Sequence, residues 1–146
     1  MEWKQGEFTI TDQREDLDID TIHNFLRESY WAKGVPRSVV TKSIDHSLCF
    51  GVYREAKQVG FARVVSDRAT FAYLADVFVV PAHRGRGLGK WLVSCVLAHP
   101  DLQGLRRWLL ATLDAHGLYE QSGFVPLCEP ERFMEIVNAS VYQRER

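Results

Sequence analysis

The stretch DVFVVPAHRGRGLGKWLV, residues 76–93, joins an apolar run to a loop rich in glycine and arginine. The run that leads into it, FAYLADVFVV (71–80), has the length and apolar character of a buried strand. In HRGRGLGKW (83–91), three glycines alternate with cationic side chains. Glycines let backbone N–H groups turn inward, and a helix N-terminus adds partial positive charge. The stretch therefore predicts a strand, a phosphate-binding loop and a helix.

Two common phosphate-binding motifs do not fit this loop. A G-x-G-x-x-G fingerprint would need glycine where the chain has Lys90, and a Walker A loop would need glycine at Arg84 and Ser or Thr at Trp91. The spacing that does fit is R-x-x-G-x-G, formed by Arg84, Gly87 and Gly89. A solvated basic helix start without any ligand is the alternative interpretation.

Composition predicts one globular domain over residues 1–146. The 146 residues are 46% hydrophobic, which is enough to bury a core. A net charge of −1 argues against a nucleic-acid partner, whose binding surface is usually basic. We find neither an apolar run of bilayer length nor the basic-then-apolar order of a signal peptide. We therefore expect a cytoplasmic protein without a membrane or nucleic-acid partner.

The cysteines and histidines predict neither disulfides nor a metal site. Cys49, Cys95 and Cys128 are odd in number and widely spaced, as is typical of reduced thiols in a cytoplasmic protein. The five histidines show no metal-ligand spacing such as H-E-x-x-H.

Periodicity predicts alternating strands and helices along the chain. Expected strands cover residues 6–11, 48–54, 58–66, 70–80, 106–113 and 132–138, and expected helices cover 19–29, 35–47, 89–99 and 115–122. Asp18 or Asp20 can cap the first helix, Pro36 can open the second, and Asp114 can cap the last. The order indicates a mixed α/β (α+β) domain with a mostly antiparallel sheet of six to seven strands flanked by about four helices.

The segments 76–93 and DAHGLYEQSGF (114–124) together resemble the GCN5-related N-acetyltransferase (GNAT) family. The coarse order of elements extends the resemblance over nearly the whole chain. It implies a single GNAT-like domain and acetyl-CoA as cosubstrate. It also implies that Tyr119, in the L-Y-x-x-x-G-F pattern, protonates the departing thiolate.

The resemblance also implies a set of cofactor-binding residues. The loop would hold the coenzyme A pyrophosphate, and the preceding strand would offer backbone groups to the pantetheine and the thioester carbonyl. These residues are Val77, Phe78, Val79, Arg84, Gly85, Arg86, Gly87, Leu88, Gly89 and Lys90.

Two positions depart from the family pattern. Many members carry asparagine seven residues before the tyrosine, where this chain has Thr112, which can still bond the cofactor through its hydroxyl. Histone-type members carry a glutamate base where this chain has Tyr73. Histone-type chemistry therefore loses support.

The general base is left open. An alkyl amine has a pKa near 10.4, so a base would help it, whereas an α-amino group with a pKa of about 7.7–8.0 hardly needs one. Asp76, His116, Glu28 and Glu120 are the candidates. Asp76 can equally be a structural partner, and His116 can equally be a surface residue of the last helix.

The acceptor pocket is expected in ESYWAKGVP (28–36), because this segment walls the amine pocket in the family. Tyr30, Trp31, Phe71 and Tyr73 can form an aromatic wall for an apolar or cationic amine, although aromatic side chains are just as often part of the core. Asp76 and His116 complete the candidate acceptor residues.

The favoured function is acetyl transfer from acetyl-CoA to a primary amine of a small molecule or to a protein α-amine. The amine would attack directly, with Tyr119 as general acid. The alternative is a non-catalytic acyl-CoA-binding regulatory module, which would not need Tyr119. The acceptor cannot be read from the sequence, and a homodimer is a further expected assembly.

Overall fold

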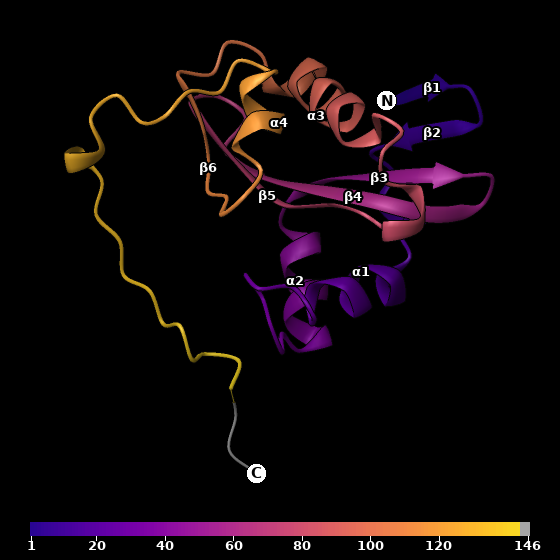
Figure 1. The fold of residues 1–146 in the computed structure, drawn as a ribbon, viewed down its shortest axis with the longest axis horizontal. Helices are drawn as coiled ribbons and strands as arrows, with labels where there is room; N and C mark the ends of the chain where they lie inside the picture. Colours follow the sequence, from indigo (N-terminus) through magenta and orange to yellow (C-terminus); the bar gives the residue numbers. More distant parts are fainter. Residues whose placement is uncertain (144–146) are drawn as a thin grey trace.

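Six strands form one mixed sheet in the computed structural model, which describes residues 1–143 (Figure 1). The strands are β1 (Glu2–Gln5), β2 (Phe8–Thr11), β3 (Leu48–Arg54), β4 (Lys57–Ser66), β5 (Phe71–Val79) and β6 (Arg107–Leu110). They lie in sequence order across the sheet, and every neighbouring pair is antiparallel except β5 and β6. The predicted mixed, mostly antiparallel sheet is confirmed.

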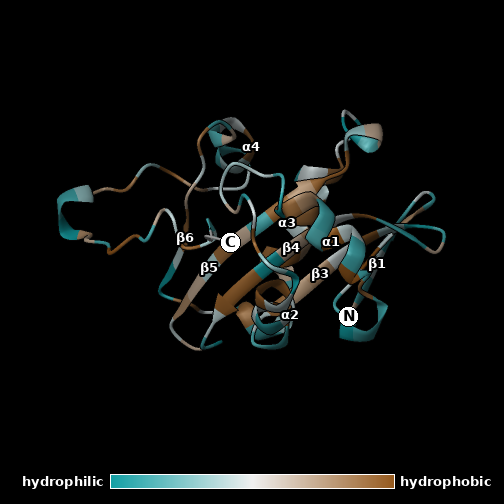
Figure 2. Ribbon diagram, turned by 90° about the horizontal axis from the view of Figure 1, so that it is seen from below, coloured by the Kyte–Doolittle hydropathy of each residue, from teal (hydrophilic) through white to brown (hydrophobic). Residues whose placement is uncertain are grey.

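Four α-helices cover the two faces of this sheet. They are α1 (Ile19–Leu26), α2 (Arg37–Asp45), α3 (Leu88–Ala98) and α4 (His116–Glu120). Figure 1 shows α3 and α4 on one face and α1 and α2 on the other. Each face therefore has its own core, with Leu92 of α3 buried in one and Ile22 of α1 buried in the other. The central strands between them are predominantly hydrophobic (Figure 2).

Local sequence signals explain where the helices begin. The carboxylate of Asp18 accepts a hydrogen bond from the Thr21 N–H at 3.2 Å, so Asp18 is the N-cap of α1. Pro36, with its fixed φ, directly precedes α2. Gly87 precedes α3 with φ = +77°, a left-handed conformation that glycine adopts without strain.

A β-bulge in β5 changes which face its side chains reach. The β4–β5 register shifts between Phe61 and Arg63, and Asp76 lies opposite the shift with φ = +57°. Before the bulge, Leu74 packs into the core under α3. After it, Phe78 packs into the core of α1 and α2, where its ring stacks on Phe25 at 4.0 Å. An even-numbered residue has therefore moved to the opposite face.

Strands β5 and β6 pair over only part of their length. The register runs from Phe71 with Arg107 to Leu74 with Leu110, and stops there. The second half of β5, from Ala75 to Val79, continues without β6 beside it. β5 and β6 therefore separate at the carboxyl ends of the only parallel pair among the described strands.

Two sequence predictions are wrong at the ends of the chain. The expected first strand over 6–11 begins at Phe8, because Gly6 turns the chain (φ = +59°) and an unpredicted strand, β1, pairs back on it. The expected last strand over 132–138 lies outside the sheet, with the side chains of Met134 and Ile136 almost fully exposed. An alternating apolar pattern alone does not make a strand, which also needs a hydrogen-bonding partner.

No helix within residues 1–143 combines the length and the hydropathy that a membrane crossing requires.

Candidate active site

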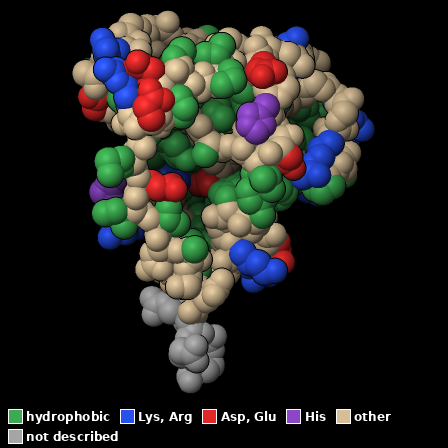
Figure 3. All heavy atoms as spheres, turned by 60° about the vertical axis from the view of Figure 1, so that its left-hand side comes forward, with side chains coloured by type: hydrophobic (Ala, Val, Ile, Leu, Met, Phe, Trp, Pro, Cys, Tyr) green, Lys and Arg blue, Asp and Glu red, His purple; other side chains and the backbone are tan. Residues whose placement is uncertain are grey.

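A cavity of about 630 Å³ lies where β5 and β6 separate. Its walls come from α1, α2 and the segment between them, from β4, β5 and β6, from the loop before α4, and from Tyr119 and Tyr142. The corresponding face of the molecule is hollowed and bordered largely by hydrophobic side chains (Figure 3). The opening in the sheet thus becomes an apolar pocket.

Tyr119 of α4 borders this cavity. It is 9% exposed, and its ring meets Phe124 edge-on at 6.0 Å. Burial, together with the nearby Tyr30, raises the pKa of Tyr119 to about 12. The hydroxyl therefore keeps its proton at neutral pH.

The glycine loop turns sharply between β5 and α3. Gly85 and Gly87 both have positive φ, and a Cβ on either would meet open space. The N–H groups of Leu88, Gly89 and Lys90 form the first turn of α3, where helix geometry supplies no acceptor. Open space beside free N–H groups fits an anionic ligand such as a diphosphate.

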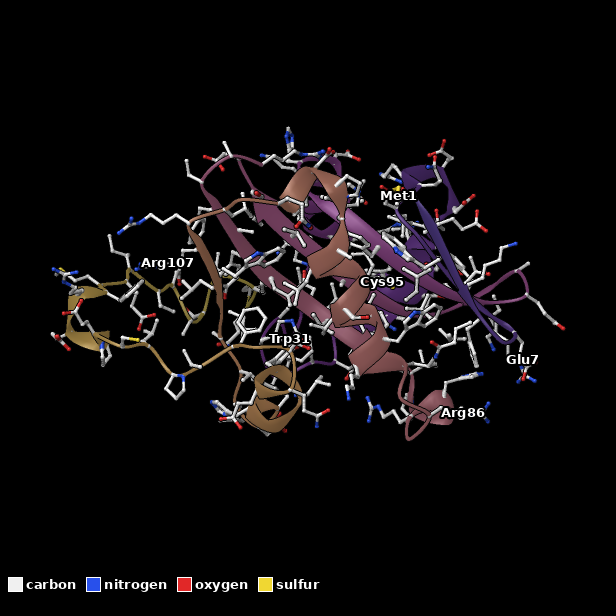
Figure 4. The ribbon with its side chains drawn as sticks, turned by 90° about the horizontal axis from the view of Figure 1, so that it is seen from above. Met1, Glu7, Trp31, Arg86, Cys95 and Arg107 are labelled. Atoms are coloured by element: carbon white, nitrogen blue, oxygen red, sulfur yellow. The ribbon has the colours of Figure 1, made fainter. Side chains whose placement is uncertain are left out.

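The arginines of the loop differ in what they contact. The Nε of Arg84 donates a hydrogen bond to the Val79 carbonyl at 2.9 Å, which ties the loop back to the end of β5. Arg86 lies at the turn before α3 with its side chain directed outward (Figure 4). Arg84 therefore shapes the loop, and Arg86 and Lys90 are further exposed cations beside the helix start.

In Val77, Phe78 and Val79, which the sequence predicts to bind the cofactor, the side chains and the backbone groups have different surroundings. Val77 lines the cavity, whereas the Phe78 side chain is buried in the core of α1 and α2. On the side of β4, Val79 pairs with Gly60. On the side of β6, this part of β5 has no strand partner, so its backbone groups face the opening.

Asp76 is held from two sides. Its carboxylate accepts a hydrogen bond from the Arg63 Nε at 2.8 Å and another from the Trp31 Nε1, also at 2.8 Å. The ion pair with Arg63 is largely buried, with 11% of the Asp76 side chain and 19% of the Arg63 side chain exposed. Both carboxylate oxygens are engaged, so the geometry makes Asp76 a positioning residue for Trp31.

Tyr30 connects two walls of the pocket. Its hydroxyl accepts a hydrogen bond from the Leu113 N–H at 2.9 Å, which joins the α1–α2 segment to the loop before α4. The rings of Tyr30 and Trp31 meet edge-on at 5.1 Å. With Tyr73, which also lines the cavity, they form three of the four aromatic side chains that the sequence placed there.

Some predicted residues lie elsewhere. Phe71 and His116 are exposed and do not line the cavity, and the same holds for the base candidates Glu28 and Glu120.

Thr112 and Asp114, which lie just before α4, both line the cavity. Ala115 is the N-cap of α4, and no side chain bonds from that position. The predicted Asp114 cap is therefore wrong. The Thr112 hydroxyl instead accepts a hydrogen bond from the Ala115 N–H at 3.1 Å, which orients the start of α4.

Arg63 and Tyr142 are two of the lining residues that sequence reasoning missed. Arg63 had a signal, since it is a lone charge in the apolar strand QVGFARVVS. Tyr142 had none, because it lies far along the chain from every motif and reaches the cavity only through the path of the C-terminal segment.

The described part of the chain contains no group of three His, Cys, Asp or Glu side chains arranged to hold a metal. All three cysteines are free thiols. Burial raises the pKa of Cys49 to about 12 and that of Cys95 to about 11, so both stay protonated and unreactive at neutral pH.

Comparison with known proteins decides the family. The family model described as acetyltransferase (GNAT) family matches residues 3–124, which include the glycine loop and Tyr119. The chain belongs to the GNAT family. The resemblance found in the two sequence motifs is therefore confirmed over most of the chain.

Two relatives carry acetyltransferase names. FG08082 of Gibberella zeae, named as an acetyltransferase, is 31% identical over 140 residues, which cover 80% of this chain and 78% of its own length. A protein of Prochlorococcus marinus named as a ycf52-like N-acetyltransferase is 32% identical over 106 residues, which cover 69% of this GNAT chain and 58% of its own.

Solved structures support the same GNAT fold. The GNAT-family protein xcc2953 of Xanthomonas campestris superimposes with a TM-score of 0.91 at 52% identity, covering 94% of this chain and 97% of its own. A protein of Clostridium acetobutylicum whose crystal structure was determined with acetyl-CoA gives a TM-score of 0.63 at 10% identity, covering 89% of this chain and 94% of its own. The second likeness is one of fold alone.

Proposed function

We propose that the protein transfers the acetyl group of acetyl-CoA to a primary amine of a small molecule or to a protein α-amine. One observation carries the proposal: a buried, protonated Tyr119 borders the cavity where β5 and β6 separate. A module that only binds acyl-CoA has no use for a proton donor at that place. Residues 1–146 would act as one acetyltransferase domain.

Acetyl-CoA would enter with its pyrophosphate on the loop between β5 and α3. The first-turn N–H groups of α3 and the cations Arg86 and Lys90 would bind the phosphates, while Gly85 and Gly87 leave room for them. A structurally similar protein of Clostridium acetobutylicum was crystallised with acetyl-CoA, which supports acetyl-CoA as the cosubstrate.

Reaction would occur in the opening beside β5. Backbone groups of Val77, Phe78 and Val79 would orient the pantetheine and the thioester carbonyl, leaving the carbonyl carbon open to direct attack by the amine. As the C–S bond breaks, the amine nitrogen would release a proton to water, while Tyr119 would donate its own proton to the sulfur and recover one from solvent. A thiol pKa near 8.5 makes the thiolate a fair leaving group, so this help is modest.

Obtaining the acceptor amine in its unprotonated form is harder than expelling the thiolate. The carboxylates that line the cavity are Asp76, which is engaged by Arg63 and Trp31, and Asp114, which is exposed. We infer that the acceptor binds as the free amine rather than losing its proton to a dedicated base. For an alkyl amine at neutral pH this costs about 4 kcal/mol, and for an α-amino group much less.

Ligand-dependent melting tests the function directly. Acetyl-CoA and CoA at about 100 times their Kd should each stabilise the protein by about 2.7 kcal/mol, whereas ATP and NAD should leave the melting temperature unchanged. A panel of amines followed by CoA release then tests turnover. Binding without turnover of any amine would favour the acyl-CoA-binding module, and no binding of either CoA species would refute both.

The cellular location, the partners and the assembly of the protein stay predictions. We propose a cytoplasmic enzyme, consistent with three free cysteines. Its partners would be acetyl-CoA and the amine, without nucleic acid. Light scattering tests for a homodimer, an assembly that the sequence left open.

A further inference from the structure

The C-terminal segment leaves the sheet after α4 and comes back to the opposite face (Figure 1). Along its way Phe133 meets Arg107 of β6, whose guanidinium carbon lies 5.0 Å from the ring centre. Figure 4 shows Arg107 directed from β6 toward this segment. The residues that follow, including Met134 and Ile136, are exposed. The segment therefore makes little contact with the body until its end.

Tyr142 is where that contact is restored. It is half-buried, packs against the core of α1 and α2, and lines the cavity. Its backbone carbonyl lies 3.4 Å from the place that a Cβ on Gly34 would occupy. Gly34, with φ = +79°, thus lets the segment pass closely over the turn between α1 and α2.

The pocket that Tyr142 completes is apolar and aromatic. Tyr30, Trp31 and Tyr73 line it from the α1–α2 segment and from β5. The remaining lining side chains from α1, α2 and the segment between them are mostly aliphatic: Leu26, Ala32, Val35, Val39 and Val40.

Charge within this pocket is nearly balanced. Arg63 and Asp76 neutralise each other at 2.8 Å, which leaves the exposed Asp114 as the only other ionised side chain among the described lining residues. A polyamine or a strongly acidic acceptor would find no matching set of charges here. An apolar body would be desolvated favourably, and a single ammonium can lie against aromatic faces as it enters.

We propose that Tyr142 closes the acceptor side of the cavity and selects small primary amines carried on an aromatic or branched aliphatic body. The inference rests on the proposed acetyl transfer, since it names the acceptor class of that same site. Tyr142 acts through its ring, because its packing places it in the wall and no hydrogen bond of its hydroxyl is needed.

Phenethylamine and ethanolamine are suitable probes, since both are primary amines and only the first carries a ring. In the wild-type protein kcat/KM should be at least about tenfold higher for phenethylamine. Tyr142→Ala should raise the KM for phenethylamine about tenfold, with kcat within threefold, and should leave ethanolamine nearly unaffected. Tyr142→Phe should behave as wild type, and so should Gln143→Ala, a matched change at the exposed neighbour.

Two controls separate this inference from the proposed function. Calorimetry measures the Kd of acetyl-CoA in each variant, which should stay constant, and the affinity of phenethylamine for the CoA-bound protein, which should fall only in Tyr142→Ala. If acetyl-CoA binds and amines turn over but Tyr142→Ala keeps its preference for phenethylamine, the selection by Tyr142 is wrong and the acetyl transfer stands. If acetyl-CoA does not bind the wild-type protein, both are wrong.

Discussion

At the scale of single residues, Asp76 shows how one backbone angle organises the pocket. Left-handed φ is uncommon outside glycine, although aspartate tolerates it better than most residues. Here it accompanies the bulge, and the displaced carboxylate reaches both Arg63 and Trp31. Of the two roles that the sequence left open for Asp76, base and structural partner, these contacts favour the structural one.

Replacing Tyr119 tests its proposed role as the general acid. Tyr119→Phe should lower kcat by roughly 10- to 10³-fold while the acetyl-CoA Kd stays within a few-fold, because a proton transferred only in the transition state does not contribute to ground-state binding. Steady-state kinetics together with calorimetry measure the two effects. The melting temperature of the variant must match that of the wild type, and an unchanged rate with chemistry limiting would mean that Tyr119 is not the acid.

The pH profile provides an independent check on the same group. Because the pKa of Tyr119 is raised to about 12, this acid stays protonated through neutral and mildly alkaline pH. The rate should therefore rise with pH as the acceptor amine loses its proton, up to pH about 10 for an alkyl amine, without a falling limb below that. Measuring kcat/KM from pH 6.5 to 10 tests this, and a bell-shaped profile centred near neutrality would contradict it.

At the scale of elements, the loop and α3 form the part of the site that the sequence predicted best. Gly87→Glu should abolish CoA binding, since a carboxylate would enter the space beside the first turn of α3. A side chain at φ = +77° also strains the backbone, so stability must be controlled. Gly104→Glu is the matched variant, because Gly104 has φ = +74° and equally open surroundings outside the loop.

Calorimetry with CoA distinguishes the two variants. Gly104→Glu should keep its wild-type affinity despite comparable strain, whereas Gly87→Glu should show no binding at millimolar CoA. Equal affinity in both would place the pyrophosphate away from the helix start.

Local signals explain what could be predicted, and long-range contacts explain what could not. The turn at the R-x-x-G-x-G loop and the hairpin of β3 and β4 depend on neighbours in sequence, and both were predicted. The cap of α1 is also local, and the sequence narrowed it to Asp18 or Asp20. The bulge at Asp76 was not, because strict alternation along β5 assumes an unbroken register. Tyr142 could not be found either, since only the folded path of the C-terminal segment brings it to the cavity.

At the scale of the whole molecule, stability should come from the two cores and not from the segment after α4. Leu92→Ala should lower the free energy of unfolding by about 2–5 kcal/mol, since the Leu92 side chain of α3 is fully buried in the core. Ile136→Asp should change it by less than about 0.5 kcal/mol, because Ile136 is fully exposed. Urea unfolding measures both. A loss for Ile136→Asp that rivals Leu92→Ala would mean that this side chain is covered, as it would be in a homodimer.

The return of Tyr142 to the pocket has a practical consequence for handling the protein. An affinity tag fused after Arg146 is separated by only four residues from Tyr142, the proposed wall of the acceptor site, and should hinder amines while leaving acetyl-CoA binding intact. The other terminus is safer, since the Met1 ammonium pairs with Asp12 at 3.0 Å beside the far edge of the sheet. Screens for the acceptor should therefore use an amino-terminal tag, cleaved before assay, so that an inactive preparation is not mistaken for an inactive enzyme.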